Sequence, residues 1–317
     1  MNTLPKEPSG ILIVNKPTGM TSHDVVNIVR RLYGTRRVGH TGTLDPLASG
    51  VLVVLVGRAA KASEYVSHAS KKYEATLRLG ITTDTEDVTG QILSTSEFIP
   101  NSEAVMTAAD SFVGNIKQTP PMYSALKVDG QKLVDLARKG VTVERRAREV
   151  TVFSLECKPT DVTIDYILDV HCSGGTYIRT LCADIGAKLG CGGVMATLKR
   201  TEACGFSING SHTVDELKEY DRDTLISLLI PTEELFSDCP SVRLPEFYEK
   251  LCRSGCEIYQ KKIGTSLPVG QRVRICGKRS EGNESGFFAL GDVIEGEVCR
   301  TPELGSAIKA IKTFDLG

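Results

Sequence analysis

The chain has 317 residues, of which 41% are hydrophobic and 24% are charged, the usual values for a soluble globular protein. Its 38 lysines and arginines are balanced by 39 aspartates and glutamates, which excludes a nucleic-acid coat protein that binds through net charge alone. No stretch approaches the ~18 consecutive apolar residues that a membrane-spanning helix needs, so we expect no membrane association.

The first nine residues have no apolar core and no cleavage pattern, and they predict a flexible tail rather than a targeting signal. The ten cysteines include no C-x-x-C pair and show no zinc-ligand spacing, so a metal site is not expected. Many thiols without a secretion signal are typical of a reducing compartment. The expected location is therefore the cytoplasm.

The first predicted elements surround one loop. Residues 10–14 predict a short buried strand, and Ser22 is the expected cap of a helix whose apolar stripe ends at Gly34. The loop GHTGTLDPLASG follows at 39–50. After it, the apolar run at 51–56 predicts a fully buried strand that anchors a sheet.

Asp45 is the reactive candidate in this loop. The glycines permit a left-handed backbone and close approach of a partner, while Pro46 restricts Asp45 to an extended conformation on a stiff turn. The alternative is an Asx turn, in which the carboxylate only bonds its own backbone. The composition of the whole segment 39–50 favours a carboxylate presented for chemistry.

The remaining elements mix strands and helices. Residues 71–79 alternate as a strand with Tyr73 on the apolar face, 101–113, 131–139 and 180–189 predict helices, and 150–155 with 162–170 predict paired strands. From about residue 241, short strands are broken by glycines. We expect an α/β (α+β) domain over 10–240, with a mixed, largely antiparallel central sheet flanked by helices, and a small β-rich C-terminal domain over 241–317.

Two more side chains are candidates for chemistry. Tyr73 is an aromatic at an apolar strand position, where a core role is the alternative. Arg179 lies near a helix start, where a cation opposes the helix dipole, so a carboxylate or a phosphate should hold it. A surface pair with Asp184 is the alternative. Residues 198–201 are expected to form a strand whose basic side chains line a groove.

Basic residues gather in runs along the chain near the Asp45 loop and again further on. The runs comprise Arg30, Arg31, Arg36, Arg37, Arg58, Lys61, Lys71 and Lys72, and then Arg138, Lys139, Arg145, Arg146 and Arg148. Any one run is typical of a solvated surface. Several of them around one candidate loop indicate an anionic partner.

These segments together resemble one family. NKPTGMTS at 15–22, GHTGTLDPLASG at 39–50, Lys72-Tyr73, GTYIRT at 175–180 and LKR at 198–200 occur in the order seen in the TruB family of bacterial tRNA pseudouridine-55 synthases. Further matches lie at 83–87 and 120–127, and the resemblance covers residues 10–235. It implies the pseudouridine synthase fold and conversion of uridine 55 in the tRNA T-arm to pseudouridine, with no metal and no organic cofactor.

The resemblance also implies roles for single residues. Asp45 would be the catalytic carboxylate, paired with Arg179, and Tyr73 would stack on the flipped uracil and handle the proton at C5. Leu198 would wall the base pocket, and His40 would stack into the RNA beside the extruded nucleotide. The substrate-binding set is completed by Tyr177, Lys72 and Lys16, the last of these in a motif that supports the catalytic loop.

The chain departs from the family at Gly174, where members often carry a lysine that can contact phosphate. The C-terminal domain loosely resembles the PUA-type RNA-binding module, and a monomer is expected. Two other functions stay open. One is a guide-RNA-dependent synthase of the Cbf5/dyskerin type, which needs partner proteins, and the other is a non-catalytic protein that binds or folds tRNA.

Overall fold

The apolar run after the Asp45 loop forms strand β3 (Ser49–Val56) in the middle of a large sheet. In this computed structural model, which describes residues 7–314 except 125, 129, 280–283 and 296–304, both faces of β3 are covered. Val51, Val53 and Leu55 pack into one apolar cluster, and Leu52, Val54 and Val56 pack into another. Two-sided burial explains why the run shows no alternation of polar and apolar residues.

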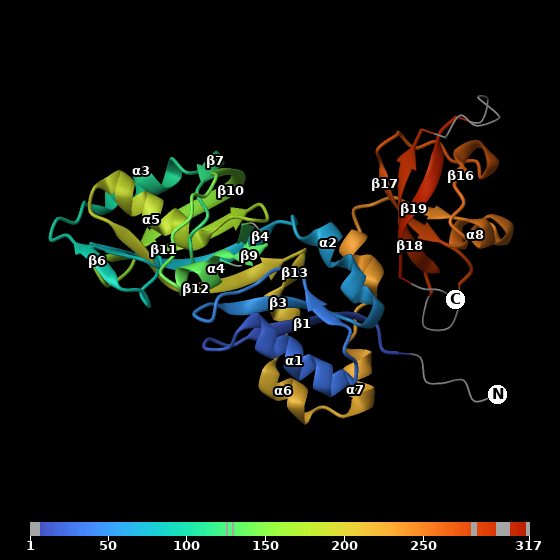
Figure 1. Ribbon diagram of the computed structural model, residues 1–317, viewed down its shortest axis with the longest axis horizontal. Coiled ribbons are helices and arrows are strands. Elements are labelled where there is room, and N and C mark those ends of the chain that lie inside the picture. The colour runs from blue at the N-terminus through green and yellow to red at the C-terminus, as the bar shows by residue number, and fades with distance from the viewer. Residues whose placement is uncertain (1–6, 125, 129, 280–283, 296–304, 315–317) are drawn as a thin grey trace.

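The large sheet is mixed and largely antiparallel, as predicted. Its strands run in the order β14-β1-β3-β12-β4-β11-β10-β7, with β2 beside β3 and β13 beside β12 (Figure 1). The β1–β14 and β3–β12 pairs are parallel. Besides β3, the strands are β1 (Gly10–Lys16), β2 (Val38–His40), β4 (Lys71–Leu79), β7 (Gly114–Gln118), β10 (Arg148–Pro159), β11 (Asp165–Cys172), β12 (Gly193–Ala203), β13 (Phe206–Ser207) and β14 (His212–Thr213).

Helices cover the two halves of this sheet separately. Helices α3 (Ser102–Asp110) and α5 (Ile178–Leu189) pack on β4, β10, β11 and β12, where Tyr73, Ala75, Leu77 and Leu79 all point into their core. Helices α1 (Ser22–Tyr33), α6 (Val214–Glu219) and α7 (Arg222–Ser227) lie against β1 and β3 (Figure 1). The alternation expected for 71–79 is confirmed.

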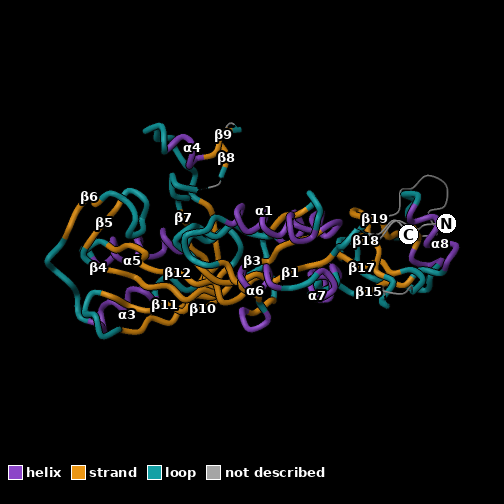
Figure 2. Tube along the Cα trace, turned by 90° about the horizontal axis from the view of Figure 1, so that it is seen from below, coloured by secondary structure: helices purple, strands orange, loops and turns teal. Residues whose placement is uncertain are grey.

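The chain segment between β7 and β10 projects from the sheet layer. It contains β8 (Lys127–Val128), β9 (Gln131–Lys132) and α4 (Leu133–Ala137), which stand clear of the layer in Figure 2. The helix expected over 131–139 is therefore shorter, because its first residues pair with β8. A second small ladder is formed by β5 (Ile81–Thr83) and β6 (Ile92–Thr95).

A separate β-rich unit lies in the C-terminal part of the chain, as expected for the fold class, and its first strand is β15 (Ser241–Arg243). Its sheet runs β15, β17 (Arg272–Cys276), β18 (Phe287–Ile294), β19 (Ala307–Thr313) and β16 (Ile258–Tyr259), with α8 (Glu246–Arg253) beside it. Phe287 and Phe314 stack with ring centroids 5.5 Å apart and reach the core of β1 and β3 through Phe236. The helical segment η1 (Gly57–Ala62) and α2 (Ser63–Val66) lie at this junction.

One local expectation needs correction. The cap of α1 is Thr21, whose hydroxyl accepts from the Asp24 amide, because Ser22 is turned inward. Of the tail expected over residues 1–9, residues 1–6 lie outside the described residues. In the remainder, the Glu7 carboxylate pairs with Arg37 at 2.9 Å, and the Ser9 hydroxyl accepts from the Ala59 amide. These contacts hold residues 7–9 beside β3.

Candidate active site

The loop that carries Asp45 is bound to its surroundings from several sides. Thr41 donates to Val53 on β3, and Gly19 donates to the Pro46 carbonyl at 2.7 Å. The amide of Ala48 bonds the Asp45 carbonyl at 3.0 Å, which closes a tight turn around the acid. The turn expected from the glycines and Pro46 is therefore present, and it is rigid.

Arg179 meets Asp45 directly. Its Nε lies 3.0 Å from Asp45 Oδ2, while Nη1 donates to the Thr85 carbonyl at 3.0 Å and Nη2 to the Tyr123 carbonyl at 2.7 Å. Every nitrogen of the guanidinium is thus engaged on the Asp45 side, which rules out the surface pair with Asp184. The Arg179 side chain is 6% exposed and that of Asp45 38%, so the carboxylate stays open to a ligand.

A cavity of about 520 Å³ opens over this pair. Its walls come from the Asp45 turn, from the loops at 18–19 and 85–89, and from the segment between β7 and β10 that projects from the sheet in Figure 2. They comprise Thr18, Gly19, Asp45, Pro46, Leu47, Thr85, Asp87, Thr89, Tyr123, Val134, Arg138 and Arg179. Volumes of this size hold a nucleoside-sized ligand.

Tyr73 and Leu198 lie beneath the Asp45 loop on neighbouring strands. Each is 8% exposed and belongs to the same apolar cluster as Leu44. Burial raises the pKa of Tyr73, so its hydroxyl is protonated at neutral pH. Both side chains are close to the loop, and their roles toward a base stay predictions.

The other predicted substrate contacts are scattered. His40 ends β2 and is half-buried; burial, with Arg200 and His23 nearby, lowers its pKa. Tyr177 precedes α5, and its backbone is held by the Gln118 side chain. Lys72 points to the face opposite Tyr73 and pairs with Glu202 at 2.9 Å, so the structure does not bring it to Asp45.

Lys16, another of the predicted substrate contacts, is fully buried. Its Nζ donates to the Pro17 and Met20 carbonyls at 2.9 and 2.7 Å. Burial lowers its pKa to about 8, while the Asp45 carboxylate opposes that shift. In this structure Lys16 supports the loop from below, and its role toward RNA stays a prediction.

Sequence reasoning missed several residues that hold the site together. Asp87 Oδ2 lies 3.8 Å from Arg179, and Asp87 Oδ1 accepts from Thr85 and Thr89. The acidic run at 84–87 hid this role because it resembled a solvated cluster. Arg200 is 1% exposed, so the expectation that it lines a groove is wrong.

The structure explains the glycine at 174. Its amide bonds the His68 carbonyl, and a Cβ here would lie 2.6 Å from the Ser67 carbonyl oxygen and 2.7 Å from His68 Cα. Any side chain, including the family's lysine, would have to displace the backbone of residues 67–68.

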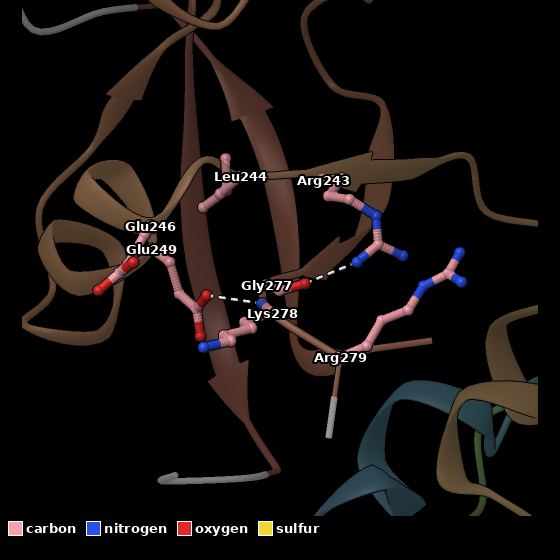
Figure 3. Close-up of a pocket in the computed structure, with 7 residues that line it drawn as sticks. All are labelled: Arg243, Leu244, Glu246, Glu249, Gly277, Lys278 and Arg279. Atoms are coloured by element: carbon pink, nitrogen blue, oxygen red, sulfur yellow. Dashed lines mark hydrogen bonds between the residues drawn. The ribbon is translucent and has the colours of Figure 1, made fainter. Parts of the chain in front are cut away.

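A second hollow, of about 440 Å³, lies on the C-terminal sheet, far along the chain from Asp45 (Figure 3). Arg243 and Arg279 lie on one side of it, and Glu246, Glu249 and the Lys278 side chain lie on the other. Arg243 donates to the Gly277 carbonyl, and the Glu249 carboxylate accepts from the Lys278 amide. None of the predicted site residues belongs to it.

Within the part of the chain that the structure describes, no three histidine, cysteine, aspartate or glutamate side chains converge as metal ligands would. Over the same residues, no helix combines the length and the apolar character needed to cross a bilayer.

Known protein families and relatives match most of this chain. The N-terminal domain of the TruB family pseudouridylate synthases matches residues 30–178, and the tRNA pseudouridylate synthase B C-terminal domain matches 179–237. The tRNA pseudouridine synthase B of Alkaliphilus oremlandii is 44% identical, over 84% of this chain and 88% of the relative. That of Syntrophotalea carbinolica is 45% identical, over 77% and 80%.

Solved structures agree with the fold. Cbf5 in a Cbf5–Nop10–Gar1 complex is 25% identical and superposes with a TM-score of 0.71, over 96% of this chain and 85% of that one. Because family domains and close relatives both cover most of the large sheet and its helices, the chain belongs to the TruB family of pseudouridylate synthases.

Proposed function

We propose that this protein converts uridine 55 in the T-arm of tRNA to pseudouridine, with Asp45 as the acting carboxylate. The observation that carries the proposal is the Asp45–Arg179 pair, in which a buried guanidinium holds a partly exposed acid at the floor of a cavity. The relatives named tRNA pseudouridine synthase B support tRNA as the substrate.

The reaction suits this residue set. It breaks the N-glycosidic bond of uridine, turns the base and rejoins it to the ribose through C5, so the atoms of substrate and product are the same. An ionised carboxylate can act in this sequence as a nucleophile or as a proton acceptor. The Arg179 guanidinium lies 3.0 Å from Asp45 Oδ2 and holds this carboxylate in place.

A uridine within a folded RNA must leave its stack before Asp45 can reach it. Extrusion costs a few kcal/mol, and stacking on an aromatic side chain returns about 1–3 kcal/mol per base. We assign Tyr73 and Leu198 to contacts with the extruded base. We assign His40 to the position that this base leaves in the RNA stack. Loop nucleotides are the least costly to extrude, which favours the T-arm loop over a helical stem.

The test is tritium release from a [5-³H]uridine-labelled tRNA transcript by the purified chain. Release by the wild type and none by Asp45→Asn is the expected result. Asp169→Asn is the matched control, because Asp169 on β11 is an exposed carboxylate that pairs with Lys158. Equal release by wild type and Asp45→Asn would remove Asp45 from its role, and no release by wild type would contradict activity without a guide RNA.

Three finer points belong to the same proposal. The 241–317 unit is a PUA-like RNA-binding domain, supported by the cations gathered in its hollow (Figure 3). The chain acts as a monomer, and it acts in the cytoplasm. Elution of the protein alone at about 34.3 kDa on size exclusion would test the monomer.

A further inference from the structure

Arg200 is a buried cation directly under the Asp45 loop. Its Nε donates to the Val51 carbonyl at 2.7 Å, Nη2 to the Gly42 carbonyl at 3.0 Å and Nη1 to the Thr43 carbonyl at 3.4 Å. Across the described residues it forms no ion pair with a carboxylate. Burying an unpaired charge is costly even when its protons are bonded, so an arginine here needs a reason beyond packing.

The strand pairing sets Arg200 between the two candidate catalytic side chains. On one side of β12, Arg200 is the direct partner of Tyr73 on β4. On the other side it is the partner of Gly50, which ends the Asp45 loop. Its side chain reaches back under Gly42 and Thr43, which lie three and two residues before Asp45.

Two glycines of the loop make room for this arrangement. A Cβ on Gly50, where φ is +101°, would lie 2.2 Å from the Arg200 carbonyl oxygen. A Cβ on Gly42 would lie 3.6 Å from Arg200 Nη1 and 3.3 Å from Lys71 Cε. Gly42 and Gly50 therefore allow the loop to pack closely against Arg200 and Lys71.

Charge gathers at the same place. Lys16 and Lys71 are buried beside Arg200. The Lys16 ammonium donates to a backbone carbonyl, and the Lys71 ammonium donates to the carbonyls of Ser67 and Ala69. Carbonyl dipoles do not cancel unit charges, so the positive potential extends to Asp45 and to the Tyr73 hydroxyl. The positive charge of Arg200 opposes the rise in the Tyr73 pKa that burial causes.

We propose that Arg200 is a positioning residue for the isomerisation, and that it serves both candidate catalytic side chains at once. It fixes the backbone that carries Asp45, and from the adjacent strand it fixes the Tyr73 ring and hydroxyl. The proposal rests on the function proposed above. Arg200 itself is buried and does not touch the RNA.

The kinetic test compares Arg200→Met and Arg200→Lys in single-turnover tritium release and in tRNA binding. Displacement of reacting groups by ~1 Å can lower a rate by about 10²-fold, so we expect a loss of that order for Arg200→Met with unchanged tRNA affinity. Arg200→Lys keeps the charge but not the three-way bonding, and it should recover part of the rate. Arg78→Met is the matched control, because Arg78 lies in the same sheet but binds Asp165.

A spectroscopic readout separates positioning from stability. In protein labelled with [ζ-¹³C]tyrosine, the Tyr73 signal is assigned by its loss in Tyr73→Phe. We expect it to move in Arg200→Met and to stay in place in Arg78→Met. An unmoved Tyr73 signal, or a rate loss no larger than that of Arg78→Met, would overturn the proposal.

A milder variant covers the case in which Arg200→Met does not fold. Gly42→Ala adds a methyl group against Arg200 Nη1 and Lys71 Cε, so it should lower the rate and shift the Tyr73 signal while tRNA still binds. A folded Gly42→Ala with wild-type rate and signal would contradict the proposal. If the wild type itself released no tritium, the proposed function would fail, yet the Tyr73 signal would still test whether Arg200 holds that side chain.

Discussion

Ser22 and Leu44 are bonded to each other twice across the gap between helix α1 and the Asp45 loop. The Ser22 hydroxyl donates to the Leu44 carbonyl at 3.0 Å and accepts from the Leu44 amide at 2.8 Å. Both backbone groups of the residue before Asp45 are therefore satisfied by one buried side chain. The start of α1 therefore sets the position of the Asp45 loop.

Ser22→Ala should destabilise the fold and slow the reaction. A buried donor and acceptor left without partners cost about 1–3 kcal/mol, and the loop loses the contact that orients Asp45. Urea unfolding and single-turnover tritium release would measure the two effects. Ser227→Ala removes an exposed hydroxyl at the end of α7 and should change neither. A Ser22→Ala protein as stable and active as wild type would refute this account of the loop.

Arg179→Lys should lower the rate by about 10²-fold or more. A lysine keeps the charge but cannot bind Asp45, Thr85 and Tyr123 together as the planar guanidinium does. Tritium release under single-turnover conditions is the measurement, with Arg78→Lys as the control for loss of a guanidinium elsewhere in the sheet. Near wild-type release by Arg179→Lys would mean that charge alone suffices.

Restoring the family's lysine at position 174 should harm this protein. Its Cβ would press on the backbone of residues 67–68, and overpacking of this kind costs about 1–3 kcal/mol. Gly210→Ala is the control, since Gly210 has open space around its Cβ position and an ordinary φ. We expect a lower urea midpoint for Gly174→Lys and no change for Gly210→Ala. Equal midpoints would show that residues 67–68 yield at no cost.

Lys16 predicts a particular pH dependence of stability. Folding lowers its pKa from 10.5 to about 8, so the unfolded chain binds more protons than the folded one between these values. The contribution of Lys16 to the free energy of unfolding therefore rises as the pH rises from about 8 to 10.5. The difference in unfolding free energy between wild type and Lys16→Met should increase from pH 7.5 to pH 9.5. A difference that stays constant or falls would contradict the burial of a charged Lys16.

Local sequence patterns determined much of the architecture. The unbroken apolar run of β3 required cover on both faces, and the alternation in β4 placed Tyr73 inside. Glycines and Pro46 around Asp45 predicted a stiff turn, which is present. These features follow from neighbours a few residues apart, for which periodicity and backbone preference are sufficient.

Only the tertiary structure decided which side chains share the site. Lys71 and Lys72 are adjacent in sequence, yet Lys71 lies buried on the Tyr73 side and Lys72 pairs with Glu202 on the other face. Arg200 reads as one more surface cation until β12 pairs with both β3 and β4 and covers it. Burial and partner choice of this kind depend on strands more than a hundred residues apart in the chain, and a local pattern carries no information about which distant strand will pair.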